Sequence, residues 1–264
     1  MIKLWTDEQQ ADFCQKLAVC RRAVLFFDYD GTLAPFVPDR DRALPYPGVR
    51  EAFERLLSIK RCRTVLVSGR KALELQPLLQ SRIPFEVWGA HGGEHLLPTG
   101  QFVQMQIPAK AQEGLALAAD RIKHLLAEQE IERKPNCVAA HFSQMSPELA
   151  SLNFSEVEDV WQAIADEFDL ELLDFHEGLE IRVPGINKSR AIKNVLLEEP
   201  KDAVTAYIGD DVTDEDAFRE LGNKSHTILI GRSNRPSAAQ WLLPAEPDGR
   251  HIIAFLNATV SALS

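Results

Sequence analysis

Short apolar runs alternate along this chain with segments whose apolar residues recur at helical spacing. The run at residues 23–27 has no polar break, which is typical of a strand buried on both faces of a parallel sheet. The runs occupy residues 23–27, 63–67, 85–88, 203–208 and 226–230. Helical spacing predicts helices at residues 7–21, 48–59, 188–198 and 247–261, and another that follows Arg70 and ends near residue 80. This alternation predicts an α/β fold built on a parallel sheet.

The middle of the chain, from about residue 108 to 184, has a different pattern. Two helices are predicted there, at residues 110–128 and 154–168. Three strands are predicted at residues 136–142, 170–174 and 179–183, the last two flanking His176-Glu177-Gly178. These elements suffice for a small sheet with two helices on one face. We therefore expect a second domain at residues 108–184, inserted into a core formed by residues 1–107 and 185–264.

Charge and cysteine content narrow the class of protein. The formal net charge is −10 and no basic cluster is visible, so nucleic acid and anionic membranes are poor partners. The four cysteines are scattered without metal-site spacing, which favours buried, reduced thiols in a cytoplasmic protein. The first residues hold no apolar core of a signal peptide, and no apolar run approaches membrane-spanning length.

The end of the first strand carries the most distinctive chemistry. Asp28 and Asp30 follow the apolar run with one residue between them, and Gly31 permits a sharp turn. Ligands of open α/β sheets bind beyond the carboxyl ends of strands. Two carboxylates there can hold Mg²⁺, and an aspartate can attack phosphorus while its neighbour moves protons. The alternatives are a simple turn cap or a calcium loop, although Thr32 stands where that loop needs a third acid and Asp39 where it needs a glutamate.

Two further strand ends carry polar side chains. Residues 63–67 lead into Ser68-Gly69-Arg70, whose hydroxyl and N–H groups suit an anion pocket but also fit an ordinary turn. Residues 203–208 lead into Asp210 and Asp211. Thr213 is expected to cap the next helix, with the acids at 214–216 in its first turn, where negative charge is stabilising. If all three ends meet at one sheet edge, a divalent cation would relieve the crowding of carboxylates there.

Lys188 has an unfavourable place for a lysine. It falls in the first turn of a predicted helix, just after Asn187, a plausible N-cap. A cation there opposes the helix dipole. A lysine that binds a phosphate would justify this position, and a solvated surface lysine is the alternative.

These residues together resemble the motifs of the haloacid dehalogenase superfamily of phosphohydrolases. Residues 28–33 match its first motif, Ser68 its second, Lys188 its third and residues 209–211 its fourth. The resemblance implies a Rossmann-like core with a cap domain inserted between the second and third motifs. Within the superfamily the chain is similar to trehalose-6-phosphate phosphatases, whose fourth motif matches residues 209–218. Ala34-Pro35, Ser68-Gly69-Arg70 and His91-Gly92 also fit that family.

Part of the cap signature of that family is also present. Its Glu-x-Lys motif fits Glu132-Arg133-Lys134, and a cap glutamate fits Glu180. Its His-Tyr-Arg motif reads His141-Phe142-Ser143 here, so the tyrosine hydroxyl and the arginine are missing.

The resemblance implies a role for each of these residues. Asp28 would be the nucleophile and Asp30 the general acid and base. Magnesium would be held by Asp28, the Asp30 carbonyl and Asp210, with Asp211 and Asp214 nearby. The phosphate group would be bound by Gly31, Thr32, Ser68, Gly69 and Lys188. The sugar would be bound by Arg70, His91, Glu132, Lys134, His141 and Glu180.

The activity implied by the resemblance is hydrolysis of trehalose 6-phosphate, with a functional link to a trehalose-6-phosphate synthase. Phosphatases of sucrose, mannosyl or glucosylglycerol phosphate remain open as alternatives. So does a phosphosugar mutase, which would move the phosphate between sugar positions. A third alternative is a catalytically silent module that binds metal or a synthase partner.

Overall fold

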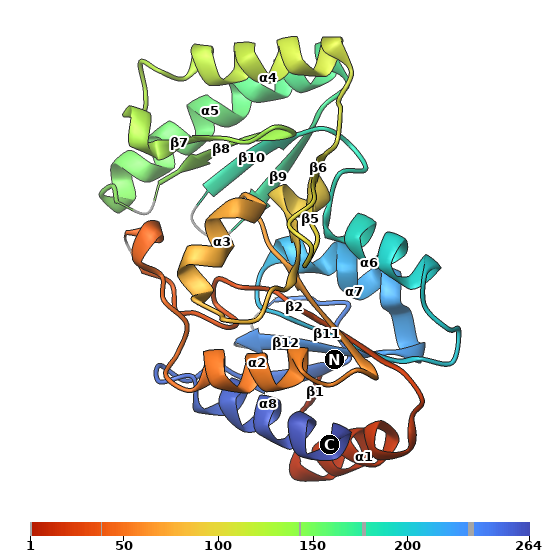
Figure 1. Cartoon of the computed structure of the whole chain (residues 1–264). Helices are drawn as coiled ribbons and strands as arrows, with labels where there is room; N and C mark the ends of the chain where they lie inside the picture. The colour runs from red at the N-terminus through yellow and green to blue at the C-terminus, as the bar shows by residue number, and fades with distance from the viewer. Residues whose placement is uncertain (1, 38, 143, 176–177, 232–234) are drawn as a thin grey trace. The chain divides into compact units, whose positions relative to one another are not determined.

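The computed structural model describes residues 2–37, 39–142, 144–175, 178–231 and 235–264. Contacts divide the chain into two compact units (Figure 1). The first unit comprises Met1–Val103 and Lys188–Ser264, and the second comprises Gln104–Asn187.

The larger sheet is mainly parallel. Its strand order is β1-β13-β12-β11-β2-β3-β4-β5-β6, with parallel pairing from β1 to β4 and antiparallel pairing of β4 with β5. In chain order the strands are β1 (Lys3–Leu4), β2 (Ala23–Phe27), β3 (Cys62–Val67), β4 (Glu86–Gly89), β5 (Glu94–Leu96), β6 (Phe102–Gln104), β11 (Val204–Gly209), β12 (His226–Gly231) and β13 (Trp241–Pro244). The predicted α/β fold with a parallel sheet is confirmed.

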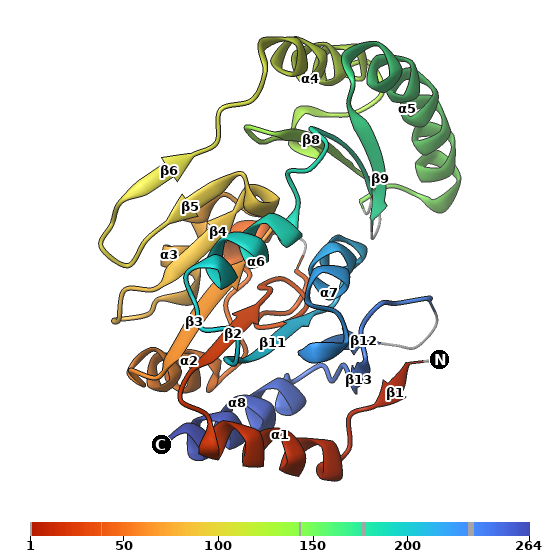
Figure 2. The same ribbon diagram turned by 90° about the vertical axis from the view of Figure 1, so that its right-hand side faces the viewer.

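Helices cover both faces of this sheet (Figure 2). One face packs against α1 (Asp7–Val19), α2 (Val49–Leu57), α3 (Ala72–Leu79) and α8 (Arg250–Leu263). The other face packs against α6 (Lys188–Leu197) and α7 (Glu215–Leu221). Short 3₁₀ turns lie at η1 (Arg40–Arg42), η2 (Ala90–Gly92), η4 (Val212–Asp214) and η5 (Gly222–Lys224).

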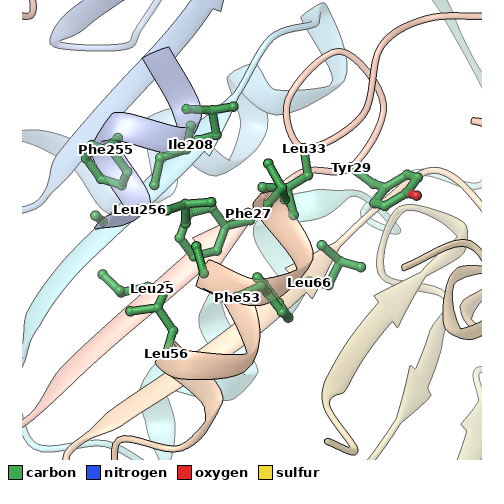
Figure 3. Packing of buried hydrophobic residues seen from close by; sticks show 14 of the residues in the cluster. Leu25, Phe27, Tyr29, Leu33, Phe53, Leu56, Leu66, Ile208, Phe255 and Leu256 are labelled. Carbon is green, nitrogen blue, oxygen red and sulfur yellow. The ribbon is translucent and has the colours of Figure 1, made fainter. Parts of the chain in front are cut away.

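The central strand β2 is buried on both sides, as its unbroken apolar sequence predicts. Leu25 and Phe27 face the cluster that includes α2 and α8 (Figure 3). Val24 and Phe26 face the cluster on the other side of the sheet, with α6 and α7. The Phe27 ring meets Phe53 of α2 edge-to-face, with centroids 5.9 Å apart. This packing fixes the position of the residues that follow β2.

The second unit contains a four-stranded sheet with strand order β7-β8-β10-β9. Its elements are α4 (Ala109–Arg121), η3 (Glu128–Glu130), β7 (Ile131–Arg133), β8 (Cys137–His141), α5 (Pro147–Phe168), β9 (Glu171–Phe175) and β10 (Gly178–Arg182). Alternate strand residues such as Val138, Ala140 and Ile181 pack with α4 and α5. Because side chains alternate along a strand, Ala139, His141 and Glu180 face the opposite side.

Helix boundaries in the second unit differ from those predicted. Helix α4 ends at Arg121 instead of residue 128, because the apolar periodicity continues into a turn whose Ile122 and Leu126 are also buried. Helix α5 begins at Pro147 instead of residue 154, because the Ser146 hydroxyl caps it by accepting a bond from the Leu149 amide. The short strands β1, β7 and β13 were not predicted, and His176 and Glu177 lie outside the described residues.

All four cysteines are free thiols; Cys62 and Cys137 are buried, as predicted, whereas Cys14 and Cys20 are only partly buried. Among the described residues, the helices are too short or too polar for any of them to cross a membrane.

Candidate active site

The three polar strand ends meet at one edge of the larger sheet, as predicted. Strands β11, β2 and β3 are adjacent and parallel, with Ile208 aligned with Phe27 and Phe27 with Leu66. The residues beyond these ends, Asp210, Asp28 and Ser68, therefore emerge side by side.

Lys188 is buried at the centre of this edge. Its Nζ lies 2.8 Å from Asp28 Oδ1 and 2.7 Å from Asp214 Oδ1, and its side chain is only 2% exposed. Burial alone would lower its pKa, but the charges and hydrogen bonds of the two carboxylates raise it above its ordinary value. Lys188 is therefore a charged member of the site, and the alternative of a solvated surface lysine is wrong.

Three carboxylates crowd around this one ammonium. Asp28, Asp210 and Asp214 each offer an oxygen within 4.8 Å of the others. Burial raises the pKa of Asp28 to about 7, with Lys188 opposing the shift and Asp214 adding to it. Burial, followed by the charges of Asp28 and Asp214, raises the pKa of Asp210 well above its usual range. Converging carboxylate oxygens are the ligands that a hard divalent cation takes, so the donor set fits such an ion.

Asp214 organises the loop that follows β11. Its Oδ2 accepts the amides of Asp210 and Asp211, each at 2.9 Å, and its Oδ1 accepts the Tyr207 hydroxyl at 2.5 Å. We expected Asp214 to fill the first turn of a helix capped by Thr213, and that expectation is wrong. Asp211 is the N-cap of η4, where its carboxylate accepts the Val212 amide, and Asp214 is itself the N-cap of α7, which starts at Glu215.

The predicted metal ligands thus separate into two groups. Asp28, Asp210 and Asp214 lie together, whereas the Asp211 carboxylate is used as a turn cap. Tyr207 was not predicted as part of the site. Its only signal in the sequence was a hydroxyl within an apolar strand, and burial raises its pKa well above the ordinary value.

Asp30 lies beside the cluster and is held by Arg70. The guanidinium donates from Nε to Asp30 Oδ2 at 2.7 Å and from Nη2 to Oδ1 at 2.6 Å. Arg70 is almost completely buried, and its amide donates to the Ser68 hydroxyl at 3.2 Å. Its observed partner is therefore the second acid of the first motif, and its contact with a sugar stays a prediction.

The turn after β2 requires glycine. Gly31 has φ +74°, and a Cβ there would collide with the Asp210 carboxylate and the Phe36 ring. The hydroxyl of buried Thr32 lies 3.5 Å from Asp210 Oδ1. The first and fourth motifs are thus in direct contact.

The turn after β4 lies against the end of β3. His91 donates its amide to the Ser68 carbonyl at 3.0 Å, and its imidazole occupies the space where a Cβ on Gly69 would lie. Ala90 and His91 both have positive φ, at 47° and 54°, which costs of the order of 1 kcal/mol each. Such strain is typical of functional sites. The pattern of the sequence indicated only a glycine-rich turn here, and the contact of His91 with a sugar, which the resemblance implies, stays a prediction.

The predicted sugar-binding residues of the second unit form their own cluster. Lys134 Nζ lies 3.3 Å from Glu132 Oε2 and 3.9 Å from Glu180 Oε2, and His141 Nε2 lies 3.1 Å from Glu132 Oε2. Strand pairing explains this, because Glu132 and Glu180 both align with Ala139 on β8. The cluster lies on the sheet face opposite α4 and α5.

Phe142 does not belong to this cluster. It is buried among the residues that pack with α4 and α5, and its ring lies 5.6 Å from that of Phe154. A tyrosine hydroxyl at this position would lie on the helix side of the sheet. Ser143, the other departure from the family motif, lies outside the described residues.

Comparisons with known proteins agree with this geometry. The profile described as Trehalose-phosphatase matches residues 26–245. A trehalose-phosphate phosphatase of Mycobacterium marinum is 28% identical over 92% of this chain and 63% of its own length. The chain spans between about a quarter and two thirds of the first curated relatives it matches.

Solved structures share the fold. The C-terminal domain of the Candida albicans trehalose-6-phosphate phosphatase has a TM-score of 0.86 at 20% identity and covers 99% of this chain and 98% of that domain. The C-terminal domain of a Candida albicans trehalose synthase regulatory protein has a TM-score of 0.71 at 12% identity, with 97% and 99% covered. Because the family profile matches most of the sequence, including every strand end described above, the chain belongs to the trehalose-phosphatase family.

Proposed function

We propose that this protein is a Mg²⁺-dependent phosphatase that hydrolyses trehalose 6-phosphate to trehalose and phosphate through an aspartyl phosphate. The observation that supports this most is the cluster of three carboxylates around one buried lysine at the carboxyl ends of β2 and β11. An excess of negative charge in a buried site is offset by a divalent cation. Phosphoryl transfer uses a carboxylate as the nucleophile and a divalent cation to stabilise charge.

Asp28 is the nucleophile in this proposal. Its carboxylate oxygen forms a bond to phosphorus as the bond from phosphorus to the sugar oxygen breaks, and Asp30 gives that oxygen a proton. Water then attacks phosphorus, Asp30 takes a proton from the water, and the Asp28 carboxylate is restored. When the Asp28 carboxylate becomes an acyl phosphate it no longer carries its own negative charge, so the Lys188 ammonium can turn to the phosphoryl oxygens while it stays paired with Asp214.

Asp28, Asp210 and the Asp30 carbonyl would hold the magnesium ion. When bound, the ion offsets negative charge and polarises the phosphoryl group. Asp214 would hold these ligands in place and not bind the ion itself, because its two oxygens already accept hydrogen bonds from Lys188, Tyr207 and two amides. Ser68 would donate its hydroxyl to the phosphoryl group, with Gly31, Thr32 and Gly69 shaping the same pocket.

Sugar recognition is proposed for Glu132, Lys134, His141 and Glu180 of the second unit, which would act as a cap. Sugar hydroxyls donate well to carboxylates and accept from an ammonium, and this cluster offers both. Phe142 faces the helices, so the missing tyrosine hydroxyl leaves this face unchanged. A functional link to a trehalose-6-phosphate synthase and a cytoplasmic location stay predictions.

The test is a phosphate-release screen with Mg²⁺ over trehalose, sucrose, mannosyl and glucosylglycerol phosphates. We expect trehalose 6-phosphate to have the highest kcat/KM and EDTA to abolish its hydrolysis. A preference for another ester would overturn the substrate, and an isomerised phosphosugar without free phosphate would identify a mutase. No turnover of any ester, with Mg²⁺ bound, would identify a silent module.

Glu180→Gln sharpens the proposal for the cap. We expect it to raise KM for trehalose 6-phosphate by about tenfold, because one carboxylate acceptor is lost, and to leave hydrolysis of p-nitrophenyl phosphate unchanged. Glu158→Gln, on an exposed position of α5, is the matched control. An equal loss on both substrates would contradict sugar recognition by this glutamate.

A further inference from the structure

The backbone around Asp210 is held from two sides. On one side, Asp214 Oδ2 accepts the amides of residues 210 and 211. On the other, the carbonyl of Asp210 accepts a bond from Nη2 of Arg235 at 3.3 Å. Arg235 lies in the segment between β12 and β13, 25 residues further along the chain. The peptide groups on both sides of Asp210 are therefore held by side chains.

Arg235 is itself anchored by Glu215, the first residue of α7. Its Nη1 lies 2.6 Å from Glu215 Oε1, and Glu215 Oε2 accepts the Ala238 amide at 2.7 Å. Glu215 is only 4% exposed, so its carboxylate is satisfied by these two donors from one segment. Helix α7 packs beside β12 (Figure 2), and this pairing connects the segment after β12 to the loop after β11.

Neither residue has a part in the proposed chemistry. Glu215 belongs to the matching stretch at 209–218, where the sequence explained it only as an acid in a first helical turn. Its contacts point outward from the carboxylate cluster, to Arg235 and Ala238. The guanidinium is the one group that reaches both Glu215 and the carbonyl of a proposed metal ligand among the described residues.

We infer that Arg235 is a positioning residue for the metal site. Held by Glu215, its guanidinium fixes the carbonyl of Asp210, and thereby directs the Asp210 carboxylate toward Asp28 and Asp214. The direction of a side chain follows its backbone dihedrals, so a peptide held on both sides keeps the carboxylate aimed without relying on the ion. The inference rests on the proposed function in naming Asp210 as a ligand of Mg²⁺.

The fork of the guanidinium is essential to this role. Two nitrogens of one planar group serve two acceptors, which a lysine ammonium cannot do in the same geometry. Arg235→Lys keeps the charge and loses the fork, whereas Glu215→Gln keeps the shape and loses the anchor charge.

The test measures binding of Mn²⁺, by electron paramagnetic resonance, and of Mg²⁺, by calorimetry, to the full chain. We expect Arg235→Ala, Arg235→Lys and Glu215→Gln each to raise the dissociation constant by about tenfold. The KM for trehalose 6-phosphate should stay within about twofold of the wild type. The double variant Arg235→Ala/Glu215→Gln should have about the same dissociation constant as the single variant that binds the ion more weakly, because both substitutions act through one contact.

Arg219→Ala is the matched control, since Arg219 makes an exposed pair with Asp216 on the same helix. Thermal unfolding in EDTA verifies that each variant is folded, and the conservative variants keep the test valid if Arg235→Ala does not fold. Unchanged Mn²⁺ affinity in a folded Arg235 variant, full affinity in Arg235→Lys, or an equal effect of Arg219→Ala would overturn the inference.

The metal readout separates this inference from the proposed function. A wild-type protein that binds Mn²⁺ without hydrolysing any phosphosugar would refute the function and still test Arg235. An active wild type whose Arg235 variants bind Mn²⁺ normally would refute the positioning role alone. A wild type that binds neither ion would overturn both.

Discussion

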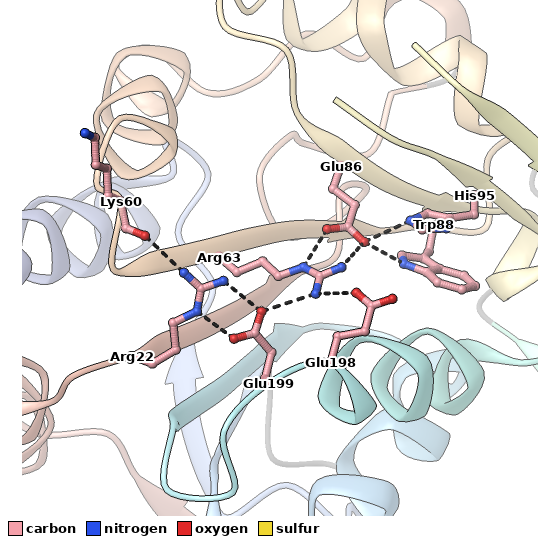
Figure 4. A network of polar contacts seen from close by, with 8 residues as sticks. All are labelled: Arg22, Lys60, Arg63, Glu86, Trp88, His95, Glu198 and Glu199. Atoms are coloured by element: carbon pink, nitrogen blue, oxygen red, sulfur yellow. Dashed lines mark hydrogen bonds and ion pairs between the residues drawn. The ribbon is translucent and has the colours of Figure 1, made fainter. Parts of the chain in front are cut away.

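Two clusters of charged side chains lie at opposite ends of the same parallel strands, and they differ in how many cationic partners their carboxylates have. At the amino ends, Arg22 pairs with Glu199 through two hydrogen bonds, and Arg63 pairs with Glu86 in the same way (Figure 4). At the carboxyl ends, three carboxylates lie together and two of them, Asp28 and Asp214, share one lysine. Burial is common to both clusters, so the difference is whether each charge has a partner.

The pKa values report this difference. Burial would raise the pKa of Glu86, but bonds from His95 and Arg63 outweigh it and lower the pKa to about 2. Burial raises the pKa of Asp28 to about 7, because the opposing effect of Lys188 does not outweigh it and the charge of Asp214 adds to it. The amino-end network is built for stability, whereas the carboxyl-end cluster holds an excess of negative charge that a divalent cation can offset.

The largest effect should come from Asp28→Asn. We expect phosphate release to fall by about 10⁴-fold or more, because an amide cannot form the acyl phosphate. The free energy of unfolding should change by no more than about 1 kcal/mol, since the crowding of carboxylates is relieved as the bond to Lys188 weakens. Substantial activity in a folded Asp28→Asn protein, measured beside the surface control Asp202→Asn, would contradict the nucleophilic role.

Arg63→Met should have the opposite profile. It leaves Glu86 buried without its guanidinium, so we expect the free energy of unfolding to fall by about 3–5 kcal/mol. Activity per folded molecule should be unchanged. Urea unfolding measures the loss, and Arg50→Met, which removes an exposed pair with Glu51, should cost far less than Arg63→Met. Equal costs of the two changes would mean that the network is not stabilising.

The Glu86 carboxyl also predicts a pH dependence of stability. Its folded pKa of about 2 lies below the ordinary value of 4.5, so its contribution is fully present above pH 4.5 and is lost as the pH falls toward 2. That contribution is of the order of 3 kcal/mol. Urea unfolding at pH values from 5 to 3 measures the free energy of unfolding at each pH. We expect this free energy to change less with pH for Glu86→Gln than for the wild type. Parallel slopes would show that Glu86 is not the titrating group.

The smallest effect concerns the ion. Mg²⁺ at a hundredfold excess over its dissociation constant should stabilise the protein by about 2.7 kcal/mol, since it binds the folded state. Asp210→Asn should lose most of this increment, and Arg63→Met should keep it. Thermal unfolding with Mg²⁺ and with EDTA measures the difference. A full increment in Asp210→Asn would place the ion elsewhere.

The sequence predicted best where local pattern and tertiary packing agree. Strand β2 has the predicted limits because its apolar run ends at Asp28, and the meeting of three strand ends follows from parallel pairing. The start of α5 was predicted seven residues too late, because Leu149 and Leu152 are exposed and interrupt the apolar stripe.

Contacts between residues that are far apart in the sequence could not be predicted from local pattern. An acid in a first helical turn and an acid that binds a buried lysine have the same local sequence, so the pattern explained Asp214 by the helix and only the family resemblance placed it near the metal. Arg235 lies in a segment without apolar periodicity, and its partners Glu215 and Asp210 become visible only in three dimensions.

The most direct test of the proposed site at Asp28 is to identify the phosphorylated residue. Enzyme quenched during turnover of trehalose 6-phosphate is reduced with borohydride, which converts an aspartyl phosphate to homoserine, and is then mapped by mass spectrometry. The account predicts homoserine at position 28, dependent on Mg²⁺ and absent from Asp28→Asn. Homoserine at another acid, or steady turnover with Asp28 never modified, would contradict it.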